Sequence, residues 1–203
     1  MKNIFKSSAL LIAFIIATSF SAALASDRLS STDIISNEYF DIFSREYVDF
    51  EPTGRVCEQA ALIELERNYY PRSQYRIEQG ISYFRGVETV GELDLVVFDK
   101  VTDEVLAVGE VKCWKNLKGA LRKAKQQQQR FKESLFNKIT IKSANGATLS
   151  LAKFKNIKDY FSIAQEGAIN AGFTYELPLN FKEFMTLRGR LLDCKVEGKC
   201  PRK

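Results

Sequence analysis

The stretch VGELDLVVFDKVTDEVLAVGEVK, residues 90–112, decides the fold of this chain of 203 residues. Its two runs rich in Leu and Val, residues 92–98 and 105–112, are joined by the polar connection DKVTDE. Two β-rich runs separated by a short polar link are typical of a hairpin. We therefore expect two adjacent antiparallel strands here.

Charged residues stand in this hairpin where apolar residues would be expected. Asp94 lies inside the first run, although Asp is disfavoured within strands. Glu110 and Lys112 end the second run, and residues two apart in a strand point to the same face. The same alternation predicts that three apolar side chains share the face opposite to Asp94: Leu93, Leu95 and Val97.

A helix with an unusual acid is expected before the hairpin, at residues 55–69. Glu58 falls in the middle of its apolar stripe. A buried carboxylate is costly unless it is paired or bound to a metal ion. The simplest explanation for Glu58 alone is a salt bridge to a nearby Lys or Arg.

The rest of the chain alternates between helical and strand patterns with short connections, which predicts an α/β domain with helices covering a sheet. The further helices are expected at 32–49, 116–136, near 158–171, and from Phe181 with Asn180 as its N-cap. The further strands are expected at 74–79, 81–84, 139–142 and 175–177. The predicted organisation is a signal peptide at 1–25, an N-terminal helical extension at 26–53, a core at 54–143, and a C-terminal extension at 144–203 packed on the same domain.

Residues 1–25 have the pattern of an export signal: a positive start, an apolar core at 9–16, and a small-x-small cleavage site at 23–25. The mature chain would begin near Ser26, be periplasmic or secreted, and have no membrane attachment. The alternative is an uncleaved membrane anchor, although the apolar run is short for a span.

Four cysteines can form disulfides in an exported chain. Cys194 and Cys200 are predicted to pair, because Gly198 between them gives the loop freedom to close. Cys57 and Cys113 are then either free thiols or a second bridge.

The chain contains no histidine. This excludes Ser-His-Asp hydrolases, Cys-His nucleophiles and imidazole zinc sites. A metal site would be rich in oxygen ligands, which favours Mg²⁺, Mn²⁺ or Ca²⁺ over Zn²⁺. Of the 30 basic residues, Lys2 and Lys6 belong to the signal, and the remaining 28 against 25 acidic residues make binding to nucleic acid depend on local patches.

The ordered set of helical Glu58, strand Asp94 and the pair Glu110-x-Lys112 resembles the PD-(D/E)xK nuclease superfamily. The resemblance covers residues 54–135, through RVCEQAALIELERNYYP and VGELDLVVFDKVTDEVLAVGEVK. It implies a restriction-endonuclease-like core, with a mixed central sheet flanked by helices. It also implies that Glu58, Asp94 and Glu110 hold Mg²⁺, or Mn²⁺ in its place, and that Lys112 positions and activates the attacking water. The proline of the motif is replaced by Leu93.

The following helix adds to the resemblance. The family pattern A-x-x-Q-x-x-(K/R)-(Y/F) matches Ala124, Gln127, Arg130 and Phe131, which makes Gln127 a candidate site residue and Gln128 the reserve. A solvated glutamine run is the alternative. Basic residues around this helix could bind phosphates, or form an ordinary solvated face: Lys115, Lys118, Arg122, Lys123 and Arg130.

Together with the export signal, the resemblance implies an exported metal-dependent nuclease that acts on DNA. Many members of the superfamily work as dimers, so a homodimer is possible here, although the sequence does not fix the oligomeric state. One alternative is a non-catalytic domain of this fold that binds nucleic acid or protein. Another is an unrelated α/β domain in which Glu110 and Lys112 form only a surface ion pair.

Overall fold

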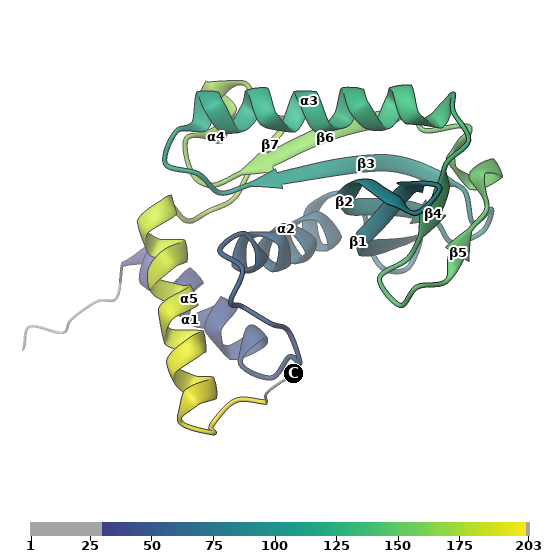
Figure 1. The fold of residues 1–203 in the computed structure, drawn as a ribbon. Helices are drawn as coiled ribbons and strands as arrows, with labels where there is room; N and C mark the ends of the chain where they lie inside the picture. The colour runs from purple at the N-terminus through teal and green to yellow at the C-terminus, as the bar shows by residue number, and fades with distance from the viewer. Residues whose placement is uncertain (1–29, 202–203) are drawn as a thin grey trace, which may run out of the picture.

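The computed structural model describes residues 30–201, so the predicted signal at 1–25 lies outside the described residues. One mixed sheet of seven strands forms the body of the protein, in the order β5-β4-β1-β2-β3-β6-β7. Helix α3 lies along one face of this sheet, and α2, with α1 and α5 beyond it, lies on the other (Figure 1). The helices are α1 (Ser31–Phe43), α2 (Arg55–Asn68), α3 (Leu117–Leu135), α4 (Ala168–Ala171) and α5 (Phe181–Val196), with a 3-10 turn η1 (Leu151–Phe154). The strands are β1 (Tyr75–Arg85), β2 (Glu88–Asp99), β3 (Val105–Lys112), β4 (Thr140–Lys142), β5 (Thr148–Leu149), β6 (Asp159–Ala164) and β7 (Tyr175–Glu176).

The expected hairpin is formed by β2 and β3, which pair in antiparallel fashion. Asp99 closes their connection, because its Oδ1 accepts hydrogen bonds from the backbone N–H groups of Val101 and Thr102. The α/β class and the mixed sheet flanked by helices are therefore confirmed.

The alternation of faces along β2 is only partly as expected. Leu95 and Val97 pack into the core beneath α2, as predicted. Leu93 instead packs in the second core, beneath α3, with Ile81 of β1. On the neighbouring strand β1, Gly80 lies between the partners of Leu93 and Leu95 and has a left-handed φ of +66°.

The helix expected near residues 158–171 is wrong. Residues 159–164 form β6, which lies between β3 and β7 and pairs in parallel with both. Phe161 and Ile163 of β6 are fully or almost fully buried in the core beneath α2, so packing within the sheet overrides the local pattern. Only the short α4 remains helical.

Other boundaries differ in smaller ways. Helix α1 ends at Phe43, well before residue 49, because the chain turns back so that the Phe50 ring packs on the Phe43 ring with a centroid distance of 5.8 Å. The strands expected at 74–79 and 81–84 form the single strand β1. The N-cap of α5 is Asn180, as predicted, and its side chain forms a capping box with Glu183.

The sheet continues past residue 143, where the core was expected to end. Strands β5, β6 and β7 come from the later segment, and β6 is the direct neighbour of β3. The residues at 144–203 thus include part of the same sheet, as well as α5, which packs against α1 and α2.

Both pairs of cysteines form disulfides. The predicted Cys194–Cys200 bridge is present, and Cys57 and Cys113, for which the sequence left two alternatives, form a second bridge. Two disulfides fit an exported protein. None of the helices between residues 30 and 201 is long and apolar enough to cross a membrane.

Candidate functional site

The candidate site lies where β2 and β3 part. Their ladder ends at the pair Leu95 and Gly109. Beyond this pair β2 continues beside β1, whereas β3 continues beside β6 as far as Lys112 opposite Ala164. Asp94 and Glu110 are therefore the first residues beyond the last paired positions, and the two strands offer no backbone partner to each other there.

Asp94 takes the place of that missing backbone partner. Its Oδ2 accepts a hydrogen bond of 2.8 Å from the backbone N–H of Val111, and another of 2.8 Å from the Lys112 ammonium. A buried N–H without an acceptor would be costly. The presence of an acid inside β2 thus has a local structural reason as well as a possible chemical one.

Lys112 joins the two acids. Its Nζ donates to Asp94 Oδ2, to Glu110 Oε2 at 2.9 Å and to the Val111 carbonyl at 2.9 Å, which uses all three N–H donors of an ammonium. Burial alone would lower the pKa of Lys112, but the negative charges and hydrogen bonds of Asp94 and Glu110 raise it above its usual value. Lys112 is accordingly a cation in this arrangement.

Glu110 is the most deeply buried acid of the group. Burial, followed by repulsion from Asp94, raises its pKa to about 8, although Lys112 opposes the shift. The side chains of Glu110 and Lys112 are only 1% and 10% exposed, so the pair is not the surface ion pair that was one of the alternatives. Glu110 Oε1 is buried and has no hydrogen-bond partner in the part of the chain that the structure describes.

Glu58 approaches the same place from α2. Burial, followed by repulsion from Asp94, raises its pKa to about 7. Arg55 lies 2.7 Å from Glu58, so the salt bridge that the sequence suggested as the simplest explanation is present. The charges of Asp94 and Lys112 also act on the pKa of Glu58, the first raising it and the second lowering it.

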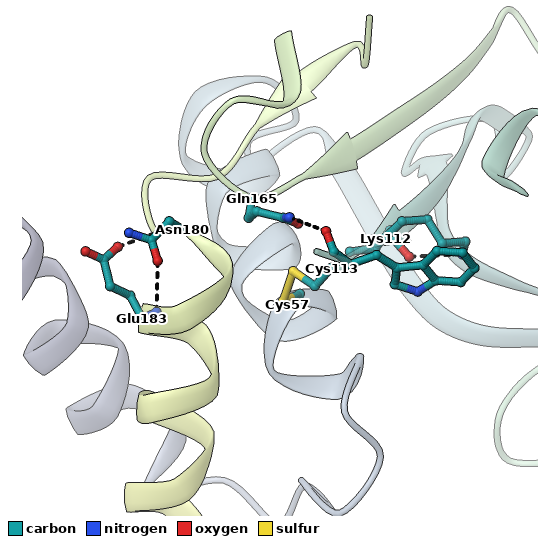
Figure 2. The surroundings of a disulfide bond; sticks show 8 residues. Cys57, Lys112, Cys113, Gln165, Asn180 and Glu183 are labelled. Carbon is teal, nitrogen blue, oxygen red and sulfur yellow. Dashed lines mark hydrogen bonds between the residues drawn. A yellow bond between two sulfur atoms is a disulfide. The ribbon is translucent and has the colours of Figure 1, made fainter. Parts of the chain in front are cut away.

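A disulfide ties these two parts of the site together (Figure 2). Cys57 precedes Glu58 on α2, and Cys113 follows Lys112 at the end of β3. Closing a loop between cysteines 56 positions apart stabilises the folded chain by about 4 kcal/mol on the loop-entropy model.

Gln79 also holds Glu58, and the sequence contained no sign of this. Its Nε2 donates to the Glu58 carbonyl at 3.0 Å, and its Oε1 accepts from Gln59 Nε2 at 2.6 Å. A glutamine inside a strand has no recognisable pattern, because its partner lies on a helix 21 residues earlier in the chain.

The two glutamines of α3 have different environments. Gln128, the reserve candidate, donates from Nε2 to the Phe161 carbonyl of β6 at 2.6 Å and so fastens α3 to the sheet. Gln127 Oε1 is buried and lacks a hydrogen-bond partner among residues 30–201. A site role for Gln127 stays a prediction.

The five basic residues predicted to bind nucleic acid are all exposed: Lys115, Lys118, Arg122, Lys123 and Arg130. Three of them, Lys118, Arg122 and Arg130, line one shallow cavity of about 630 Å³ along α3, together with Lys125. This cavity contains one acid, Glu133. The arrangement provides positive charge on the outer side of α3.

The three acids expected to bind a metal ion can be compared with the ligands that divalent ions prefer. Glu58, Asp94 and Glu110 offer only carboxylate oxygens, which Mg²⁺ prefers, and Glu110 Oε1 is an acceptor with no other use in the described chain. As placed, no three Asp, Glu or Cys side chains within residues 30–201 are gathered closely enough to hold a metal ion. Lys112 occupies the space between Asp94 and Glu110 instead.

No family model matches this sequence, and comparisons with curated proteins and with solved structures gave no significant match.

Proposed function

We propose that this chain is an exported metal-dependent nuclease that hydrolyses phosphodiester bonds in DNA and belongs to the PD-(D/E)xK superfamily with its restriction-endonuclease-like core. One relationship carries the proposal: Lys112 Nζ bridges Asp94 and Glu110 at the point where β2 and β3 part. Acids and a lysine with these spacings in the sequence thus meet at one place in the fold.

Glu58, Asp94 and Glu110 would hold Mg²⁺, or Mn²⁺ in its place. When bound, the ion supplies a water molecule of lowered pKa and a positive charge that stabilises the phosphate in the transition state. Glu58 and Glu110, whose pKa values are raised to about 7 and about 8, must lose their protons to become ligands. Binding of the ion should therefore strengthen as the pH rises through this range.

Lys112 has a distinct role in this proposal. As a cation it places positive charge beside the acids, where it favours a phosphate oxygen of the substrate and helps to position the attacking water. The exposed basic residues of α3 would bind the phosphates farther along the strand.

A binding domain without catalysis is the second candidate, and one observation favours it. Lys112 already bonds to both Asp94 and Glu110, so each of these two acids has a partner without any metal. Such a domain would retain DNA in a manner that depends on salt and not on divalent ions.

The test uses the mature chain and plasmid DNA, with MgCl₂ or with EDTA. The proposal predicts cleavage that requires Mg²⁺ or Mn²⁺ and stops with EDTA. Salt-sensitive retention of DNA without cleavage under either condition would instead establish the binding domain. Absence of both cleavage and retention would exclude both functions.

A further inference from the structure

Glu58 lies in the first turn of α2, whose N-cap Gly54 has no side chain to bond to the helix. Backbone groups alone close this turn: the N–H of Arg55 donates to the Pro52 carbonyl, and the N–H groups of Cys57 and Glu58 donate to the Gly54 carbonyl. The ends of a helix fray more readily than its interior. Any opening of this turn would carry Glu58 away from Asp94 and Lys112.

The Cys57–Cys113 disulfide joins this turn to the chain at the end of β3. Cys57 is the residue directly before Glu58, and Cys113 is the residue directly after Lys112. Figure 2 shows the bridge crossing from α2 to the chain that leaves β3. Both cysteines are buried, at 0% and 5% exposure, so the bridge lies between packed elements and not on the surface.

Other contacts also hold the start of α2 to the sheet, because Val56 is fully buried in the core and Gln59 Nε2 donates to Gln79 Oε1 of β1 at 2.6 Å. Gln79 holds the Glu58 carbonyl through one hydrogen bond, and Arg55 pairs with Glu58 from within the same helical turn. The Arg55 pair moves with the turn and cannot hold it to the sheet. The disulfide is the covalent link between the helical acid and the strand lysine.

We propose that the Cys57–Cys113 disulfide positions Glu58 against the strand acids, so that the site is assembled only in the oxidised protein. This inference rests on the nuclease function proposed above and adds its redox condition. On oxidation the two thiols lose two protons and two electrons to a disulfide-carrying oxidant, whose own disulfide becomes two thiols. A chain still in a reducing cytosol would hold free thiols, and its nuclease site would be incomplete before export.

The second disulfide provides a matched control. Cys194 and Cys200 are only 6 positions apart and close a short loop at the end of α5. Removing this bridge changes the same chemistry at a place that contains none of the four charged site residues.

The experiment compares Cys57→Ala/Cys113→Ala with Cys194→Ala/Cys200→Ala. One measurement is hydrogen exchange of the amides of residues 55–58, and the other is the cleavage rate of plasmid DNA at saturating Mg²⁺. We expect faster exchange and a kcat lower by roughly 10- to 100-fold in the first variant, with KM for DNA little changed, since a small misplacement of a site residue has effects of this size. The control should match the wild type in both.

A second variant distinguishes the effect of losing the covalent link from the effect of losing the apolar volume of the two cysteines. Cys57→Ala/Cys113→Val restores apolar volume with residues suited to a helix and to extended chain, but contains no bridge. It should show the same fast exchange and low kcat. Wild-type exchange and cleavage in this variant would overturn the proposal. If the oxidised wild type cleaves no DNA, the nuclease function fails, and the exchange measurement alone still decides whether the disulfide holds the first turn of α2.

Discussion

The Lys112 ammonium lies 2.8 Å from Asp94 Oδ2 across the point where β2 and β3 separate. Asp94 comes from the strand that continues beside β1, and Lys112 from the strand that continues beside β6. Their contact therefore connects the two diverging strands. Glu110 accepts a second hydrogen bond from the same lysine. Asp94, Glu110 and Lys112 thus stabilise the fold where the strands separate, and they are also a candidate reaction site.

Replacing Asp94 should show both roles. Asp94→Ala removes one acid from a buried ion pair and leaves the Val111 N–H without its acceptor, so we expect a loss of about 3 kcal/mol in the free energy of unfolding. Asp94→Asn should lose less, because the amide oxygen can still accept from Val111. Urea denaturation measures both, with Asp103→Asn as an exposed control. If Asp94→Ala and the wild type are equally stable, Asp94 does not stabilise the contact between β2 and β3.

The pKa values of Glu58 and Glu110 predict how stability depends on pH in the absence of divalent ions. Burial and Asp94 raise both above the usual value of 4.5, to about 7 and about 8. The folded protein then binds more protons than the unfolded chain between pH 5 and 8, so the free energy of unfolding falls as the pH rises.

We expect a decrease of several kcal/mol from pH 5 to pH 9, measured by urea denaturation in EDTA. Glu110→Gln should flatten this slope, because the amide cannot ionise. A stability that is constant or rises over this range would show that the acids are not held in the way described here.

A substitution at Gly109 tests how closely β3 packs against Phe161 next to the site. An added Cβ at this position would overlap the ring of Phe161 on the neighbouring strand β6. Gly109→Ala should therefore destabilise the protein by about 1 to 3 kcal/mol. Gly189 is the matched control, because an added Cβ there meets nothing within 4 Å and α5 should gain about 1 kcal/mol from Ala. Thermal unfolding that ranks the two variants in the opposite order would refute this packing.

The basic side of α3 should contribute to binding and not to chemistry. Arg122→Gln removes one positive charge from the cavity along α3, so we expect a weaker affinity for DNA and a salt dependence reduced by about one unit of slope. Fluorescence anisotropy at several salt concentrations measures both. Lys182→Gln on α5 is the control and should leave the slope unchanged. An unchanged slope for Arg122→Gln as well would place the DNA elsewhere.

Much of the site could be predicted because its residues belong to elements that are neighbours along the chain. The hairpin and the spacing of Glu110 and Lys112 are local patterns, and both are present in the fold. On α2 the apolar positions that are buried are Val56, Cys57, Ala60, Ala61 and Leu65, and Glu58, with its side chain 20% exposed, lies at the edge of this face and not in its middle. A connection of five residues between β2 and β3 leaves little freedom, so Asp94 and Lys112 are brought close together.

The features of the fold and the site that the sequence did not predict depend on contacts between segments far apart in the chain. The strand at 159–164 was mistaken for a helix because its parallel partner β3 lies about 50 residues earlier, and no local pattern contains that pairing. The Cys57–Cys113 bridge and the Gln79 contact with Glu58 likewise join separate elements. Leu93 packs with Ile81, Phe131 and Phe154 in the second core, and these neighbours come from three other elements of the chain.

The most direct test of the central proposal is the single-turnover rate of DNA cleavage by Lys112→Met in saturating Mg²⁺. Lys153→Met is its matched control, because Lys153 also pairs with an acid, Asp103, at an exposed place outside the site. We predict a rate for Lys112→Met that is lower by roughly 100-fold or more, as is typical when a charge that stabilises the transition state is removed. The rate of Lys153→Met should equal that of the wild type. Cleavage by folded Lys112→Met at the wild-type rate would contradict the account.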